Sequence, residues 1–175
     1  MALYRGRKSP VFIGIFFIIS MICLEKIGKI AEEKLAGSSL FVVDIRSAPG
    51  NEIELLIDSD SSVSIEHCAA LSRAIETELG DDAGDFELTV SSAGIGRPLK
   101  VFRQYKKLIG RPVEVVLMSG IKITAELRDA VPDAITIAWE EMVAVEGKKR
   151  KQPVERIETY PLSEVKSTAE RLDFK

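Results

Sequence analysis

The amino-acid sequence predicts an α+β protein in two parts, a layer of helices on a small sheet followed by a small β-barrel. Up to residue 109, apolar residues recur at helical and strand spacing in the order helix, strand, strand, helix, strand, with one further helix. That order is typical of helices packed over one face of a three-stranded sheet. From residue 110, short strand-like runs follow one another with turn residues between them, which is typical of a small barrel.

The elements of the first part are predicted from apolar spacing and from the residues that start and end helices. The first is a helix over residues 21–37. Two strands follow, with Phe41, Val43 and Ile45 inward in one and Ile53, Leu55 and Ile57 inward in the other. A second helix then runs from an N-cap at Ser64 to Gly80, and a third strand has Phe86, Leu88 and Val90 inward. The further helix covers residues 101–109. We expect one domain over residues 21–109 and a second over 110–175, divided at Gly110-Arg111-Pro112.

The second part contains four strand-like runs and an ambiguous end. The runs cover residues 113–117, 122–127, 135–139 and 154–160. Residues 163–166 are predicted to form one helical turn. Beyond them, Thr168, Leu172 and Phe174 are spaced as in a closing strand, and a C-terminal helix through Arg171 is the alternative.

Residues 1–20 differ from the rest of the chain. Arg5, Arg7 and Lys8 precede an uncharged, largely apolar segment, an arrangement typical of a signal peptide or membrane anchor. The apolar run is shorter than the roughly 20 residues that a spanning helix needs, and no small-residue cleavage site follows it. We expect translation to begin at Met21, so that residues 1–20 are a non-native upstream extension. A short membrane anchor is the alternative.

A glycine-containing loop joins the third strand to the helix that follows it. Gly94 and Gly96 allow backbone conformations closed to other residues, and Pro98 suits a first helical position. The loop is therefore predicted to present backbone N–H groups and Arg97 at a helix N-terminus, where phosphate or carboxylate groups bind. A plain connector is one alternative, and an Arg97 that pairs with a carboxylate such as Glu87 is another.

This loop and its flanks resemble the signature of the RimP family of ribosome maturation factors, usually V-S-S-P-G-x-x-R-P-L. The chain reads V-S-S-A-G-I-G-R-P-L and then F-R-Q-Y-K-K-L-I-G-R-P-V. Ala93 stands where the pattern has proline, which leaves the loop less rigid; the residues kept in register are Ser91, Ser92, Gly94, Arg97, Pro98 and Leu99. The resemblance extends over residues 21–175. It implies an SH3-like or Sm-like barrel as the second domain, binding to the assembling small (30S) ribosomal subunit, and a ribosomal protein near the decoding centre as a partner.

Charge is distributed unevenly along the chain. Residues 21–96 carry 5 basic and 15 acidic groups, whereas residues 97–175 carry 16 basic and 12 acidic groups. The whole chain has a net charge of −3, and without the three cations of residues 1–20 it has −6, which argues against a protein that simply coats RNA. The acidic first part is expected to favour a basic protein partner. The candidate RNA-facing cations are Lys100, Arg103 and Lys107 on one face of the helix after the loop, and Lys148, Lys149, Arg150 and Lys151 in a basic loop. A solvated hairpin tip is the alternative for the basic loop, and keeping the protein soluble is the alternative role of the acidic surface.

The sequence contains no recognisable catalytic or metal-binding motif. His67 is the only histidine, and Cys23 and Cys68 fit no metal or redox spacing. Together with the family resemblance, this predicts a non-enzymatic, cytoplasmic assembly factor with no metal, cofactor or small-molecule substrate, which binds the small subunit as a monomer and without a membrane. Its predicted contact residues are the basic sets above together with Ser91, Ser92, Gly94, Gly96, Arg97 and Pro98. The alternative is an Sm-like regulator that binds small RNAs and forms rings.

Overall fold

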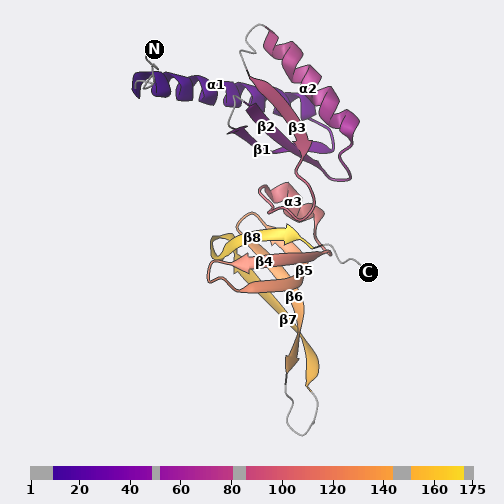
Figure 1. Ribbon diagram of the computed structural model, residues 1–175. Coiled ribbons are helices and arrows are strands. Elements are labelled where there is room, and N and C mark those ends of the chain that lie inside the picture. Colours follow the sequence, from indigo (N-terminus) through magenta and orange to yellow (C-terminus); the bar gives the residue numbers. More distant parts are fainter. Residues whose placement is uncertain (1–9, 49–51, 81–85, 144–150, 172–175) are drawn as a thin grey trace, which may run out of the picture. The chain divides into compact units, whose positions relative to one another are not determined.

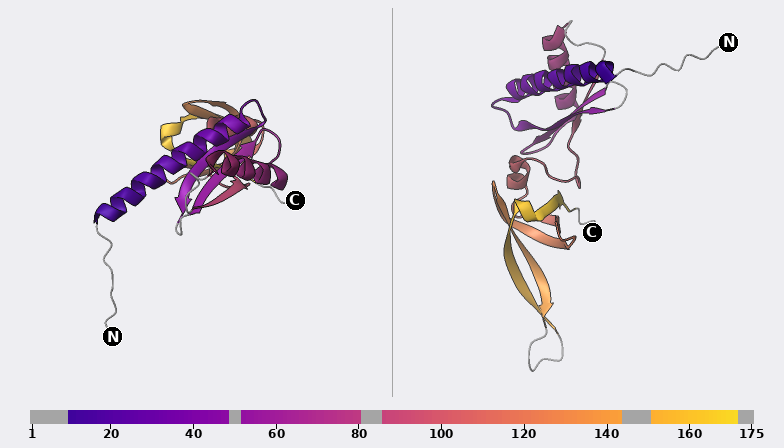
Figure 2. Two further views of the ribbon diagram at one scale, coloured as in Figure 1. Left: turned by 90° about the horizontal axis from the view of Figure 1, so that it is seen from above. Right: turned by 90° about the vertical axis from the view of Figure 1, so that its left-hand side faces the viewer.

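The computed structural model describes residues 10–48, 52–80, 86–143 and 151–171 (Figures 1 and 2). The chain divides into two compact units, Met1–Ser92 and Ala93–Lys175. Within the described residues, no helix combines the length and the apolar character needed to cross a membrane.

The first unit is a three-stranded sheet with two helices on one face. Its elements are α1 (Pro10–Leu35), β1 (Leu40–Ala48), β2 (Glu52–Ser59), α2 (Ile65–Leu79) and β3 (Glu87–Ser92). The sheet has the order β1-β2-β3, in which β1 and β2 are antiparallel and β2 and β3 are parallel. A parallel pair needs a crossover, and α2 supplies it. The predicted order of helix, strand, strand, helix, strand is therefore confirmed.

The core of this unit lies between the helices and the sheet. Ile53, Leu55 and Ile57 of β2 are all buried in it, as the strand alternation predicted, and α2 contributes Leu71 and Ile75. Burying one such side chain contributes roughly 1.5–3 kcal/mol relative to exposing it. The central strand and the apolar stripe of α2 therefore hold this layer together.

Two first-unit predictions differ from the structure. The helix predicted from Met21 begins earlier, at Pro10, a residue that a first helical position tolerates. In β1, Phe41, Val43 and Ile45 do not share one face. Phe41 and Val43 are buried, but Leu40 and Val42 are the residues that pack against the core. A register shift follows between Val42 and Asp44, and Ile45 then packs inward. The extra residue of such a bulge reverses which side chains face the core.

The start of α2 explains the single histidine. The Ser64 hydroxyl accepts a hydrogen bond from the His67 backbone N–H (3.3 Å), and His67 Nδ1 accepts one from the Ser64 backbone N–H (3.2 Å). This reciprocal pair satisfies two N–H groups at the helix start. The structural role that His67 plays is thus a capping one at an exposed position.

The second unit is a five-stranded antiparallel sheet preceded by a short helix. Its elements are α3 (Phe102–Lys107), β4 (Pro112–Leu117), β5 (Lys122–Val131), β6 (Ala134–Val143), β7 (Gln152–Pro161), the 3₁₀ helix η2 (Leu162–Glu164) and β8 (Val165–Glu170). The strand order is β7-β6-β5-β4-β8. The helical turn predicted near residue 163 corresponds to η2. Because β8 pairs with β4, the alternative of a helix through Arg171 is wrong for residues 165–170, while Leu172 and Phe174 lie outside the described residues.

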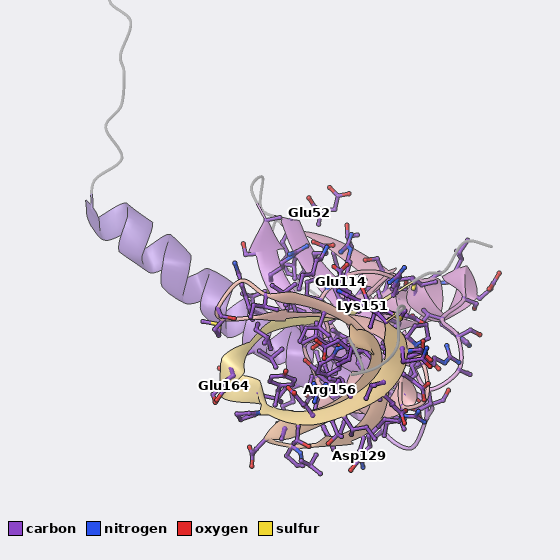
Figure 3. The ribbon with its side chains drawn as sticks, turned by 90° about the horizontal axis from the view of Figure 1, so that it is seen from below. Glu52, Glu114, Asp129, Lys151, Arg156 and Glu164 are labelled. Carbon is purple, nitrogen blue, oxygen red and sulfur yellow. The ribbon has the colours of Figure 1, made fainter. Side chains whose placement is uncertain are left out.

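The connection through η2 requires this sheet to curl. It joins β7 to β8, which are the two outermost strands of the sheet. In a flat sheet those strands would lie roughly 19 Å apart, at about 4.8 Å per neighbouring pair. The step from Pro161 to Val165 spans at most about 14 Å. The strands accordingly curve around a group of side chains (Figure 3).

The two units divide at an earlier point than the predicted boundary at Gly110-Arg111-Pro112. Leu99, Tyr105 and Leu108 all pack against the core of the second unit. The backbone also connects this segment to the second unit, since the Gly110 N–H donates to the Leu127 carbonyl oxygen (2.7 Å). The helix that was assigned to the first domain is therefore part of the second unit, because its apolar side is buried there.

Candidate functional site

The predicted contact residues fall into both units. Ser91 and Ser92 end β3 in the first unit. All the other candidates that the structure describes, from Gly94 to Lys107 and Lys151, lie in the second unit. Lys148, Lys149 and Arg150 are outside the described residues, and Lys151 is exposed directly before β7.

The glycine loop has the conformation that its sequence predicts. Gly94 and Gly96 have φ values of 76° and 77°, in the left-handed region that side chains disfavour. A Cβ atom built on Gly94 would lie 3.7 Å from Nε of Arg97, so the arginine side chain lies over this glycine. Ala93, the departure from the family signature, is buried. The loop thus presents an exposed guanidinium above a turn that glycine makes possible.

The loop does not, however, lead directly into a helix. Pro98 forms an isolated bridge with Ala169, and the Leu99 N–H donates to the Thr168 carbonyl oxygen (2.7 Å). Pairing with β8 holds this segment extended, so α3 begins only at Phe102 and the predicted place of Pro98 at a helix start is wrong.

The N–H groups before α3 already have an acceptor. The backbone N–H groups of Lys100 and Val101 both donate to Oε1 of the buried Gln104, at 2.9 and 3.4 Å. What the candidate site retains is the Arg97 side chain and the cations near α3, rather than an anion site at a helix N-terminus.

Of the three cations predicted to share one face of this helix, Lys100 precedes α3, and only Arg103 and Lys107, both half-buried, lie within it. Arg103 and Lys107 are one turn apart on the same side, and Tyr105 and Leu108 are buried on the opposite side. Lys106, which sequence reasoning did not select, lies with its Nζ 5.0 Å from the centroid of the Phe102 ring. The spacing of an aromatic residue and a lysine four positions apart was the available signal for this cation–π contact.

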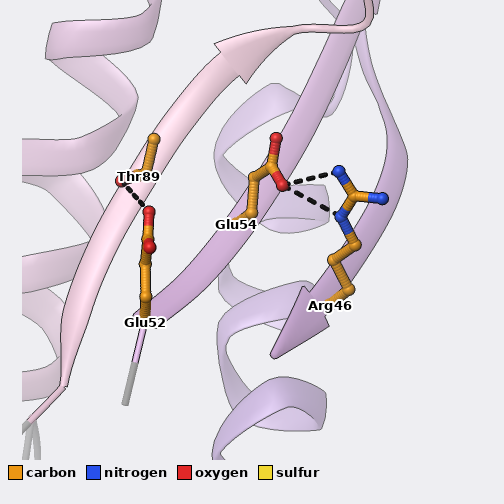
Figure 4. Close-up of polar contacts among 4 residues, drawn as sticks. All are labelled: Arg46, Glu52, Glu54 and Thr89. Carbon is orange, nitrogen blue, oxygen red and sulfur yellow. Dashed lines mark hydrogen bonds and ion pairs between the residues drawn. The ribbon is translucent and has the colours of Figure 1, made fainter. Parts of the chain in front are cut away.

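On the sheet face opposite the helices of the first unit, β2 carries the acidic residues Glu52, Glu54 and Asp58 together with the buried Leu56. The Arg46 guanidinium donates two hydrogen bonds to Oε2 of Glu54 (2.9 and 2.7 Å), and Thr89 Oγ1 donates to Glu52 (3.1 Å) (Figure 4). The hydrogen bonds that the Arg46 guanidinium donates to Glu54 raise its pKa. These contacts fix acidic side chains of this face, which favour cationic groups over nucleic acid.

The second unit also has an acidic hollow, on the outside of its sheet. The hollow has a volume of about 580 Å³ and is lined in part by Trp139, Glu140 and the carboxylates that pair with Arg128. Arg128 contacts Glu126 (3.1 Å) on its own strand and Glu155 (2.9 Å) on β7. Since these three carboxylates outnumber the one cation, the hollow favours a positively charged partner over RNA.

Neither cysteine has the lowered thiol pKa that a nucleophile needs. Burial raises the pKa of both Cys23 and Cys68, so both thiols are protonated at neutral pH. In the part of the chain that the structure describes, no three histidine, cysteine, aspartate or glutamate side chains gather in a group that could hold a metal ion.

Comparison with known proteins connects this geometry to a family. The RimP N-terminal domain family matches residues 27–96. A protein of Porphyromonas gingivalis named ribosome maturation factor RimP is 38% identical over 146 residues, which cover 83% of this chain and 96% of the relative. The chain belongs to the RimP family. Another relative of the same name, from Christiangramia forsetii, is 32% identical over 86% of this chain and 98% of its own length.

The RimP matches cover residues of both units of the chain. The N-terminal RimP match ends at Gly96, so it covers the core of the first unit and the glycine loop. The RimP relatives match 146 and 151 residues, which is more than either unit contains. Similarity to RimP therefore extends over both units, which confirms the family resemblance found in the sequence.

Proposed function

We propose that this chain is a ribosome maturation factor that binds the assembling small (30S) ribosomal subunit in the cytoplasm and assists its maturation without catalysing a reaction. The observation that carries this proposal is similarity over nearly the whole length of relatives named ribosome maturation factor RimP. The curled five-stranded sheet with its 3₁₀ connection supports an SH3-like or Sm-like barrel as the second domain.

The proposed mechanism is differential binding. A factor that contacts an immature conformation of the subunit more favourably than the mature one shifts the population during assembly and needs no chemical step. The rRNA phosphates would be contacted by basic side chains of the second unit, because guanidinium and ammonium groups form charge-assisted hydrogen bonds with phosphate. These side chains are Arg97, Lys100, Arg103 and Lys107. That contact would be supported by Ser91 and Ser92 at the end of β3 and by Gly94, Gly96 and Pro98 after it. A second basic contact would come from Lys148, Lys149, Arg150 and Lys151.

A basic ribosomal protein near the decoding centre is the proposed protein partner. The acidic hollow beside Trp139 supports a contact through the second unit, and the acidic side chains Glu52 and Glu54 on the first-unit sheet add a second surface of the same sign. One copy of the chain would bind each subunit.

Gradient sedimentation of a lysate containing the full chain tests the proposal. We expect the chain in the fractions of free small subunits and not in those of whole ribosomes. Equal recovery across all ribosomal fractions, or none in any of them, contradicts the proposal. Ring-sized assemblies that carry short RNAs and no subunits would favour the Sm-like regulator instead.

A further inference from the structure

The strand β7 is a long, exposed edge of the second-unit sheet. It pairs with β6 on one side, and no strand in the described part of the chain pairs with its other side. Val154 and Ile157 on it are 40% and 59% exposed. The ladders β1·β2, β4·β8 and β5·β6 each contain a register shift, whereas β6·β7 contains none. A regular, exposed edge of this kind is a template for pairing with another strand.

Two prolines indicate which backbone groups point outward from this edge. Pro153 and Pro161 are paired in register with β6 but have no N–H to donate to it, so they suit positions whose backbone nitrogen points away from β6. Hydrogen-bonding direction alternates along an antiparallel strand. By that alternation, outward-pointing N–H and C=O groups also belong to Glu155, Ile157 and Thr159. These three residues form the unpaired edge of β7 between Pro153 and Pro161.

The sequence of β7 is complementary to itself in one antiparallel register. If two copies pair about Ile157, that residue faces its own counterpart and Glu155 faces the partner's Thr159. These outward-pointing residues then exchange hydrogen bonds with one another. Arg156 faces the partner's Glu158, as a close cross-strand pair of opposite charge. We propose that the free chain self-associates through a two-fold antiparallel pairing of β7 centred on Ile157.

The adjacent registers that preserve the hydrogen bonding are disfavoured by charge. Centring the pair on Arg156 places two arginines opposite each other, and centring it on Glu158 places two glutamates opposite each other. Directly opposed like charges destabilise a strand pair. The present partner of Arg156, Glu141 at 2.8 Å, does not prevent the new contact, since both side chains are about half exposed and exposed ion pairs exchange at little cost.

The interface is a closed, isologous one, in which the same residues are used twice. It contains only the short edge between two prolines, so we expect weak, concentration-dependent dimers. This goes beyond the proposed function and does not depend on it, since it concerns the free chain. It also departs from the monomer expected from the sequence.

Cysteine cross-linking tests the register. In a hydrogen-bonded pair the two Cα atoms lie about 5.5 Å apart, within the range for a disulfide. Ile157→Cys should therefore give a covalent dimer under mild oxidation. Thr159→Cys is the matched control on the same edge, because its counterpart would lie roughly 13 Å away. The unsubstituted chain, oxidised in parallel, reports any contribution from Cys23 and Cys68.

Charge exchange tests the interface without oxidation. Arg156→Glu or Glu158→Arg, each alone, should raise the dimer dissociation constant by roughly tenfold in sedimentation equilibrium, since each creates two like-charge pairs in the dimer. An equimolar mixture of the two variants should recover dimers, because the heterodimer has opposite charges at both pairs. Unchanged circular dichroism confirms that each variant is folded. A chain that is monomeric at every concentration, equal cross-linking at both cysteine positions, or a mixture that stays monomeric would each overturn the proposal.

Discussion

Replacing Arg97 with alanine separates a binding role of this residue from a structural one. Its side chain is exposed and lies over Gly94, and the turn beneath it is set by glycine backbone conformations. A substitution at such a surface position changes stability by less than about 0.5 kcal/mol. For a unit of this size that corresponds to a melting temperature change of at most about 4 °C.

The expected effect on binding is larger. Losing a hydrogen bond to a charged group costs about 1–3 kcal/mol, which is roughly a 5- to 150-fold weaker affinity for the free small subunit. The slope of log affinity against log salt concentration should become shallower by about one, because one phosphate contact is lost. Microscale thermophoresis or filter binding at several salt concentrations measures both quantities.

Arg111→Ala is the matched control for this experiment. Arg111 is also an exposed arginine of the second unit, but it forms an ion pair with Glu170 at 3.3 Å. We expect its removal to leave binding to the subunit unchanged. If Arg97→Ala instead melts several degrees lower and binds normally below its melting point, Arg97 is a structural clamp, for which Glu87 is the suggested partner. The contact surface must then be sought at Lys100, Arg103 and Lys107.

Three further predictions concern stability and ionisation. Ile57→Ala should lower the free energy of unfolding in urea by about 2–5 kcal/mol, because Ile57 is fully buried in the central strand. A fragment of residues 93–175 should unfold cooperatively, whereas one of residues 110–175 should not, since it lacks the apolar side of α3; two equally cooperative fragments would contradict this. The hydrogen bond to Glu158 raises the pKa of Tyr160 from 10.0 to about 12, so its stabilising effect is present below pH 10 and is lost as the pH rises through 12. Ultraviolet titration should show this high transition in the native chain and its return toward pH 10 in Glu158→Gln.

Local patterns in the sequence were sufficient for much of the fold. The alternation in β2, the apolar stripe and Ser64 cap of α2, and the glycines of the loop all depend on backbone geometry within a few residues. The family signature around Arg97 is likewise a continuous stretch, so the sequence was enough to indicate the family.

Other features depended on contacts between residues far apart in the chain. Pro98 was predicted to start a helix, but its bridge to Ala169 keeps it extended, and no local pattern reports a partner so distant in sequence. The bulge after Val42 follows from the pairing of β1 with β2 and cannot be read from alternation alone. Pairing with β4 likewise decided between strand and helix at residues 165–170. The spacing of apolar residues predicts which side chains are buried, whereas tertiary packing determines which element they pack against. For this reason the sequence predicted the apolar side of α3 but not that it packs in the second unit.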